Sequence, residues 1–168
     1  MEKGRKYVMA GPLKVQYCSL MAENYYATMQ YDSAWSCFET ALSLDPENII
    51  VNNNYAYYLA EQNEKLEKAV EMSGFTIDIE PKNATYLDTY AWILYKMGKS
   101  KQARKYLEKA LKNNGGDDAE ILDHYGDILF ELGKYQDSVE NWRKAVDLDA
   151  TKNDTILPKI KNAEQEIR

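Results

Sequence analysis

The chain is poor in the residues that build metal and thiol chemistry, with two cysteines, Cys18 and Cys37, and one histidine, His124, among 168 residues. Neither cysteine stands at a zinc-ligand spacing from His124, so no metal site is expected. A cysteine nucleophile would also need a second histidine as its base. We expect packed free thiols rather than a disulfide, because cysteine is often buried for its size alone.

Long apolar runs and an excess of positive charge are lacking as well. No stretch approaches the roughly 18 apolar residues of a membrane-spanning helix. No charged segment followed by an apolar one opens the chain as in a signal peptide. The net charge of −6 argues against binding to nucleic acid. The compartment stays open: cytoplasmic, or periplasmic if a signal precedes this sequence.

Catalytic motifs are missing too. The sequence contains no G-x-x-x-x-G-K-[ST], no G-x-G-x-x-G and no G-x-S-x-G pattern. Carboxylates such as Asp88 and Asp123 could share a proton across adjacent helices, but on an open groove we expect them to stay hydrated and ionised. The sequence therefore predicts a protein that is not an enzyme and carries no cofactor.

What the chain does have is a repeat marked by small residues. Ala22, Ala56, Ala91 and Gly126 follow one another at intervals of 34, 35 and 35 residues. In each unit two further small residues come next: Ala34 and Ala41, Ala69 and Thr76, Ala103 and Ala110, Ser138 and Ala145. A period of this length indicates a stack of supersecondary units, which builds an extended surface rather than a catalytic pocket.

Within each period the apolar residues have helical spacing and divide into two stripes. The predicted helix pairs are 15–28 with 32–44, 49–61 with 66–79, a stripe through 87–94 with one through 103–111, and 119–132 with 135–148. Asn48, Asn83 and Asp117 or Asp118 precede first helices, where a short polar side chain can cap exposed N–H groups. Close crossing of the two helices explains the small residues, and Gly126 and Ala91 should not tolerate enlargement.

The two ends of the chain differ from the repeats. Residues 153–168 are predicted to form a capping helix with one apolar stripe, which Asp154 or Thr155 begins and in which Pro158 lies in the first turn. Residues 1–14 form no clean amphipathic pair, and we interpret them as the tail of a preceding repeat in a longer array.

The order of large, small and aromatic residues resembles the tetratricopeptide repeat (TPR) family of bacterial type across residues 15–152. The first unit has Met21, Ala22, Tyr25, Tyr31, Ala34, Phe38, Ala41 and Pro46 in the family's order. Two departures are mild: an extra residue in the inner turn of the second unit, and Asn-Asn-Gly-Gly instead of proline after the third. The resemblance implies an all-α right-handed solenoid with repeats at 15–48, 49–83, 84–118 and 119–152.

The resemblance also implies that the first helix of each unit lines a concave groove. The candidate partner-binding residues on this face are Glu23, Tyr26, Asn53, Tyr57, Asp88, Trp92, Tyr95, Asp123, Asp127 and Phe130. Aromatic rings anchor many interfaces and carboxylates attract basic partners, while Lys96 is the one cation expected among them. Equally open is a second interpretation, in which the rings pack between units and the acids are merely solvated.

The function predicted is therefore a scaffold for a basic or polar protein or peptide. Binding of carboxylate-ended chaperone tails is not expected, because Ser19, Thr85 and Thr89 stand where that activity needs cations. Two alternatives remain: homo-oligomerisation through the exposed face of the N-terminal helix, with Leu13 and Leu20 at the contact, and glycan binding by rings beside carboxylates.

Overall fold

The computed structural model describes residues 11–168, and within that range the regular structure is helical throughout. The elements are α1 (Gly11–Ala27), α2 (Tyr31–Leu44), α3 (Ile49–Glu61), α4 (Leu66–Ile79), α5 (Ala84–Lys96), α6 (Ser100–Lys112), the 3-10 turn η1 (Gly115–Asp117), α7 (Ala119–Glu131), α8 (Tyr135–Leu148), the 3-10 turn η2 (Ala150–Lys152) and α9 (Asn153–Glu166). None of these helices is long and apolar enough to cross a membrane.

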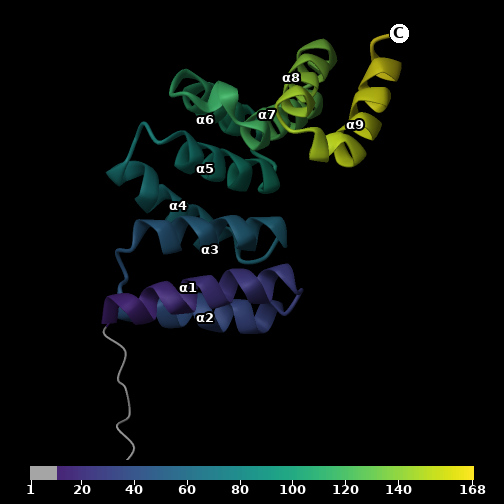
Figure 1. The fold of residues 1–168 in the computed structure, drawn as a ribbon. Helices are drawn as coiled ribbons and strands as arrows, with labels where there is room; N and C mark the ends of the chain where they lie inside the picture. Colours follow the sequence, from purple (N-terminus) through teal and green to yellow (C-terminus); the bar gives the residue numbers. More distant parts are fainter. Residues whose placement is uncertain (1–10) are drawn as a thin grey trace, which may run out of the picture.

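Consecutive helices pack as antiparallel pairs that stack in chain order (Figure 1). First helices also meet one another: α3 packs on α5 and α5 on α7, and Asn54 of α3 donates a hydrogen bond to Glu23 of α1. The stack is curved enough that Tyr57 of α3 reaches Glu120 of α7 past the intervening α5. First helices therefore line the inner side of the curve, and the predicted all-α solenoid is confirmed.

The small residues of the repeat lie where helices cross. Ala22, Ala56 and Ala91 are fully buried, with 0% of their surface exposed. At the fourth position a Cβ on Gly126 would lie 2.4 Å from the indole of Trp142. The shared frame of these residues is thus a packing requirement, as the sequence predicted.

Polar caps begin three of the first helices as predicted. The side chain of Asn48 accepts a hydrogen bond from the Val51 amide, and Asn83 does the same for Tyr86. Asp118 accepts from two amides at the start of α7. These bonds satisfy N–H groups that the first turn of a helix leaves free.

The two ends differ from expectation. Helix α1 begins at Gly11 rather than Val15, and the predicted tail of a preceding repeat falls mostly on residues 1–10, outside the described part of the chain. Helix α9 begins at Asn153 without a side-chain cap, because η2 leads directly into it, so the predicted cap at Asp154 or Thr155 is wrong. Pro158 consequently lies inside α9 and not in its first turn.

Helix α9 packs against α8 and buries Ile156, Ile160 and Ala163 there. Its place beside the fourth repeat is visible in Figure 1. Both cysteines are free thiols, Cys18 buried and Cys37 half-buried, which confirms that expectation.

Candidate functional site

A pocket of about 420 Å³ opens on the inner face. Residues from the first helix of every repeat line it: Glu23, Asn53, Asn54, Tyr57, Tyr58, Thr85, Asp88, Thr89, Asp118, Glu120 and Ile121. We call this cavity the open pocket. Its wall carries four carboxylates, two amides and four hydroxyl groups, so it is rich in polar groups that can bind a ligand.

Helical spacing places these side chains. Asn53 and Tyr57 are four residues apart on α3, so both lie on the face that looks toward α5 and α7. Asp88 has the same relation to Trp92 on α5. Each repeat therefore contributes neighbouring side chains to one continuous wall.

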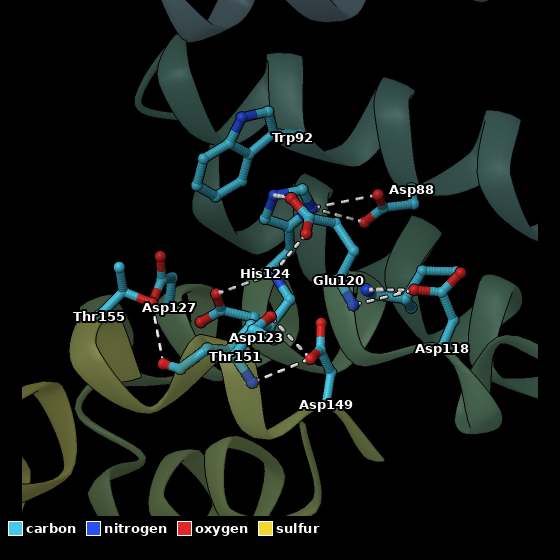
Figure 2. Close-up of polar contacts among 12 residues, drawn as sticks. Asp88, Trp92, Asp118, Glu120, Asp123, His124, Asp127, Asp149, Thr151 and Thr155 are labelled. Atoms are coloured by element: carbon cyan, nitrogen blue, oxygen red, sulfur yellow. Dashed lines mark hydrogen bonds and ion pairs between the residues drawn. The ribbon is translucent and has the colours of Figure 1, made fainter. Parts of the chain in front are cut away.

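Beneath the open pocket lies His124, which is 4% exposed. Its Nδ1 lies 3.0 and 3.1 Å from the two carboxylate oxygens of Asp88, and its Nε2 lies 3.4 Å from Oε1 of Glu120. The imidazole stacks on Trp92 with ring centroids 3.9 Å apart. Figure 2 shows Asp88, Trp92 and Glu120 gathered around it. This cluster joins α5 to α7.

Electrostatics favour the charged form of this imidazole. Burial by itself would lower the pKa of His124, but the carboxylates of Asp88, Glu120 and Asp123 outweigh it and raise that pKa. An imidazolium has two N–H donors, one toward Asp88 and one toward Glu120. With both ring nitrogens engaged, His124 has no free nitrogen to act as a general base.

Neighbouring cations keep the carboxylate of Glu120 in its charged form. Burial would raise its pKa, but the ammonium of Lys152, which bonds Glu120, and nearby His124 lower it overall. The hydroxyl of Tyr57 donates to Oε1 of Glu120 at 3.0 Å. Burial and the charge on Glu120 raise the pKa of Tyr57, so the phenol stays neutral as a donor.

Near the C-terminal end of the inner face lies a second pair of carboxylates, Asp123 and Asp127, which already bind a cation of the same chain. Lys159 of α9 places its ammonium 2.8 Å from Asp123 and 2.7 Å from Asp127. The indole of Trp142 donates to Asp127 at 3.1 Å, and Lys159 lies 5.7 Å from that ring's centroid. We call these four residues the closed cluster. Burial raises the pKa of Asp127, and Lys159 offsets this only in part.

The predicted site residues thus divide into groups. Glu23, Asn53, Tyr57 and Asp88 line the open pocket. Asp123 and Asp127 belong to the closed cluster. The expectation that Asp88 and Asp123 are hydrated is wrong, because they are only 4% and 9% exposed and are paired with cations.

Most of the predicted rings pack internally. Trp92 is 7% exposed, stacks on Tyr95 as well as on His124, and donates its indole N–H to Glu61 at 2.7 Å. The ring centroids of Tyr26 in the first repeat and Tyr58 in the second lie 4.1 Å apart. The remaining ring, Phe130, packs against Tyr135 and Trp142. Tyr26 and Trp92 thus contact a ring of the next repeat, whereas Phe130 packs within the fourth helix pair.

Sequence reasoning overlooked the cations that reach this face. Lys96 is not the only one, since Lys152 at the end of the fourth repeat and Lys159 beyond it also reach this face. A signal was present: Lys159 follows Asp123 by 36 residues, one repeat further along. Extending the frame into α9 would have placed its ammonium beside those carboxylates.

Comparison with known proteins supports the repeat interpretation. The family model described as tetratricopeptide repeat matches residues 14–152. The TPR repeat-containing protein PA4667 of Pseudomonas aeruginosa is 30% identical over 95 residues, which cover 55% of this chain and 15% of that protein. The chain thus spans a small part of this relative.

Solved structures share the fold at low identity. A structure from the functional characterization of Pseudomonas aeruginosa pilF has a TM-score of 0.67 at 22% identity, covering 82% of this chain and 62% of that one. MamA gives 0.66 at 13%, covering 91% and 82%. The Sgt2 TPR domain from Aspergillus fumigatus gives 0.65 at 19%, covering 73% and 82%.

Proteins of this fold generally serve as scaffolds for protein–protein interaction. The family match covers all four helix pairs and the small residues at their crossings. The chain belongs to the tetratricopeptide repeat family.

Proposed function

We propose that this protein is a non-catalytic scaffold whose open pocket binds a segment of a basic or polar partner protein. The observation that carries the proposal is the pocket of about 420 Å³, which the first helices of all four repeats line together. A pre-formed wall of packed helices loses little conformational entropy when a peptide binds. An extended or helical segment could therefore lie along it.

The charge of the pocket sets the kind of partner. Glu23, Asp88, Asp118 and Glu120 face it, while His124 and Lys152 offset only part of their charge. A wall with residual negative charge attracts basic segments and repels acidic ones.

The test begins with peptides selected on the full chain from a display library of unbiased sequence. Two variants with the same charge change then decide where the peptides bind. Glu23→Lys reverses a charge on the pocket wall, and Glu71→Lys reverses an exposed charge on α4, outside the pocket. We expect Glu23→Lys to weaken the selected peptides about tenfold or more.

Glu71→Lys should leave the same affinities within about a factor of two, since a distant exposed charge is screened by salt. Fluorescence anisotropy on both variants measures this. Equal losses from the two variants, or no loss from either, would show that the pocket is not the binding site.

A second candidate is self-association through α1, as the sequence suggested. Leu13, Tyr17 and Leu20 form an apolar stripe on one side of this helix and are 55%, 53% and 53% exposed. Such a stripe can be buried against a second copy. Sedimentation equilibrium should show a dimer that Leu13→Glu with Leu20→Glu abolishes and that Leu157→Glu on α9 does not.

A further inference from the structure

We propose that the open pocket is a receptor for one cationic side chain, a lysine or arginine of the partner, which bonds Asn53 and Asp88. This inference rests on the proposed function and makes it specific. It names the residue type that anchors the partner and the atoms that receive it.

The closed cluster shows how this wall accepts an ammonium. Lys159 of α9 inserts between Asp123 and Asp127, at 2.8 and 2.7 Å, beside the indole ring of Trp142. The site thus consists of first-helix carboxylates and an aromatic neighbour, with the cation supplied from one repeat further along. The groups that hold this ammonium, two carboxylates and an indole ring, could make the same contacts with a lysine of another chain.

One row of equivalent positions runs along the inner face. Asn53, Asp88, Asp123 and Lys159 follow one another at repeat spacing. Each acidic member is paired with a cation from the next unit: Asp123 with Lys159, and Asp88 with His124. By the same pattern, the side chain of Asn53 should receive a hydrogen bond from a donor in the third repeat.

Among residues 11–168, Asn53 has no such donor. Its carbonyl oxygen Oδ1 is buried without a hydrogen-bond partner there; the residue is 5% exposed and lines the open pocket. Its Nδ2 reaches only the oxygen of Asn54, at 3.4 Å. A buried acceptor left unpaired is costly, and native proteins rarely keep one without a reason. A bound N–H donor would satisfy it.

The surrounding groups favour a cation over other ligands. Glu23 and Asp88 supply negative charge, and the rings of Tyr57 and Tyr58 can cover an aliphatic stem. A carboxylate ligand would face these acids without a free cation on the pocket wall. A metal ion is not favoured, because residues 11–168 hold no group of three or more His, Cys, Asp or Glu side chains that could ligate one.

The experiment compares three small probes on the full-length chain by nitrogen–proton NMR. They are Nα-acetyl-lysine methylamide, the norleucine analogue with the same stem but no charge, and the glutamate analogue. The lysine probe should give saturable shifts at the backbone amides of Asn53, Asp88 and Thr89. It should bind about tenfold tighter than norleucine, since charge-assisted hydrogen bonds are the strong ones. The glutamate probe should not bind there.

A pair of variants tests the role of the orphan oxygen. Asn53→Leu keeps the branching at Cγ and removes the acceptor, so lysine binding should weaken about tenfold. Asn162→Leu makes the same change at an exposed position on α9 and should have no effect. If Asn53→Leu does not fold, the three probes on the unmodified chain still decide.

Several results would overturn the inference: equal binding of lysine and norleucine, preference for glutamate, or lysine shifts on another surface. The broader proposal has its own readout. If selected peptides still lose affinity with Glu23→Lys while the lysine probe fails, partner binding stands and the cationic anchor is rejected. If the affinity of the selected peptides does not change with Glu23→Lys, the pocket itself is rejected as the partner site.

Discussion

The open pocket and the closed cluster are built from the same kinds of side chain on equivalent helices, yet one is filled and the other is not. In the closed cluster Lys159 of α9 satisfies Asp123 and Asp127. In the open pocket the side-chain oxygen of Asn53 has no hydrogen-bond partner in the described part of the chain, and a cavity remains. The difference is the donor that the next repeat supplies. Among residues 11–168, Asp88 and Glu120 of the open pocket are paired with His124 and Lys152, whereas Glu23 has no ion pair.

Removing the cation of the closed cluster should have the largest effect. Lys159→Met keeps most of the stem and removes the nearer cation from two mostly buried carboxylates, after which Asp123 keeps Lys152 at 3.8 Å and Asp127 keeps the Trp142 indole. Breaking a buried ion pair costs about 3–5 kcal/mol, and partial exposure of Lys159 reduces our expectation to about 2 kcal/mol. Urea unfolding measures this loss.

The matched control is Lys161→Met, on the exposed side of the same helix. It should change the free energy of unfolding by less than about 0.5 kcal/mol. If both variants lose the same amount, the ion pairs of Lys159 contribute nothing, and the comparison between the two regions fails.

Enlarging the small residue under the closed cluster should have a smaller net effect. A Cβ at position 126 would lie 2.4 Å from Trp142, whose indole donates to Asp127. Gly126→Ala should cost about 1–3 kcal/mol by overpacking, offset by about 1 kcal/mol of helix propensity. Thermal or urea unfolding reports the balance.

Gly74→Ala on α4 provides the contrast, since its Cβ would meet only Tyr90 at an ordinary 3.7 Å. We expect it to be neutral or stabilising. If Gly126→Ala were more stable than the unmodified chain, the crossing of α7 and α8 would have space for a Cβ, and the packing requirement would be rejected.

The pH dependence of stability that His124 causes should be the smallest effect. His124 lies between the open pocket and the closed cluster, so its titration reports on the boundary between them. Asp88, Glu120 and Asp123 raise the folded pKa of His124 above its ordinary value against the effect of burial. Its stabilisation is complete below the unfolded value of about 6.5 and is lost as pH rises through the folded pKa, by at most about 1.4 kcal/mol per pH unit.

Because His124 is the single histidine, its ring protons identify it directly in a proton NMR titration. The midpoint should be higher in the folded chain than in urea. A folded midpoint at or below the unfolded one would show that burial outweighs Asp88.

The sequence predicted the helix pairs closely, because small residues at crossings and capping side chains before first helices act locally. The bounds of α3, α4 and α8 agree with those predicted. Of the ten candidate site residues, Glu23, Asn53, Tyr57 and Asp88 line the open pocket. The sequence did not show how exposed or how paired these side chains are. Repeat period and helical spacing place Asp88 and Trp92 on one helix face, but they do not show that His124 contacts both of them.

The sequence by itself determined an all-α stack of four helix pairs, because a 34- or 35-residue frame and helical periodicity are properties of the chain alone. Only the tertiary structure decided which acids are neutralised and where a cavity is left. That outcome depends on side chains a full repeat or more apart meeting within about 3 Å, which is the length of a hydrogen bond. The curvature of the stack brings Tyr57 to Glu120 and α9 to Asp123, and no local pattern specifies it.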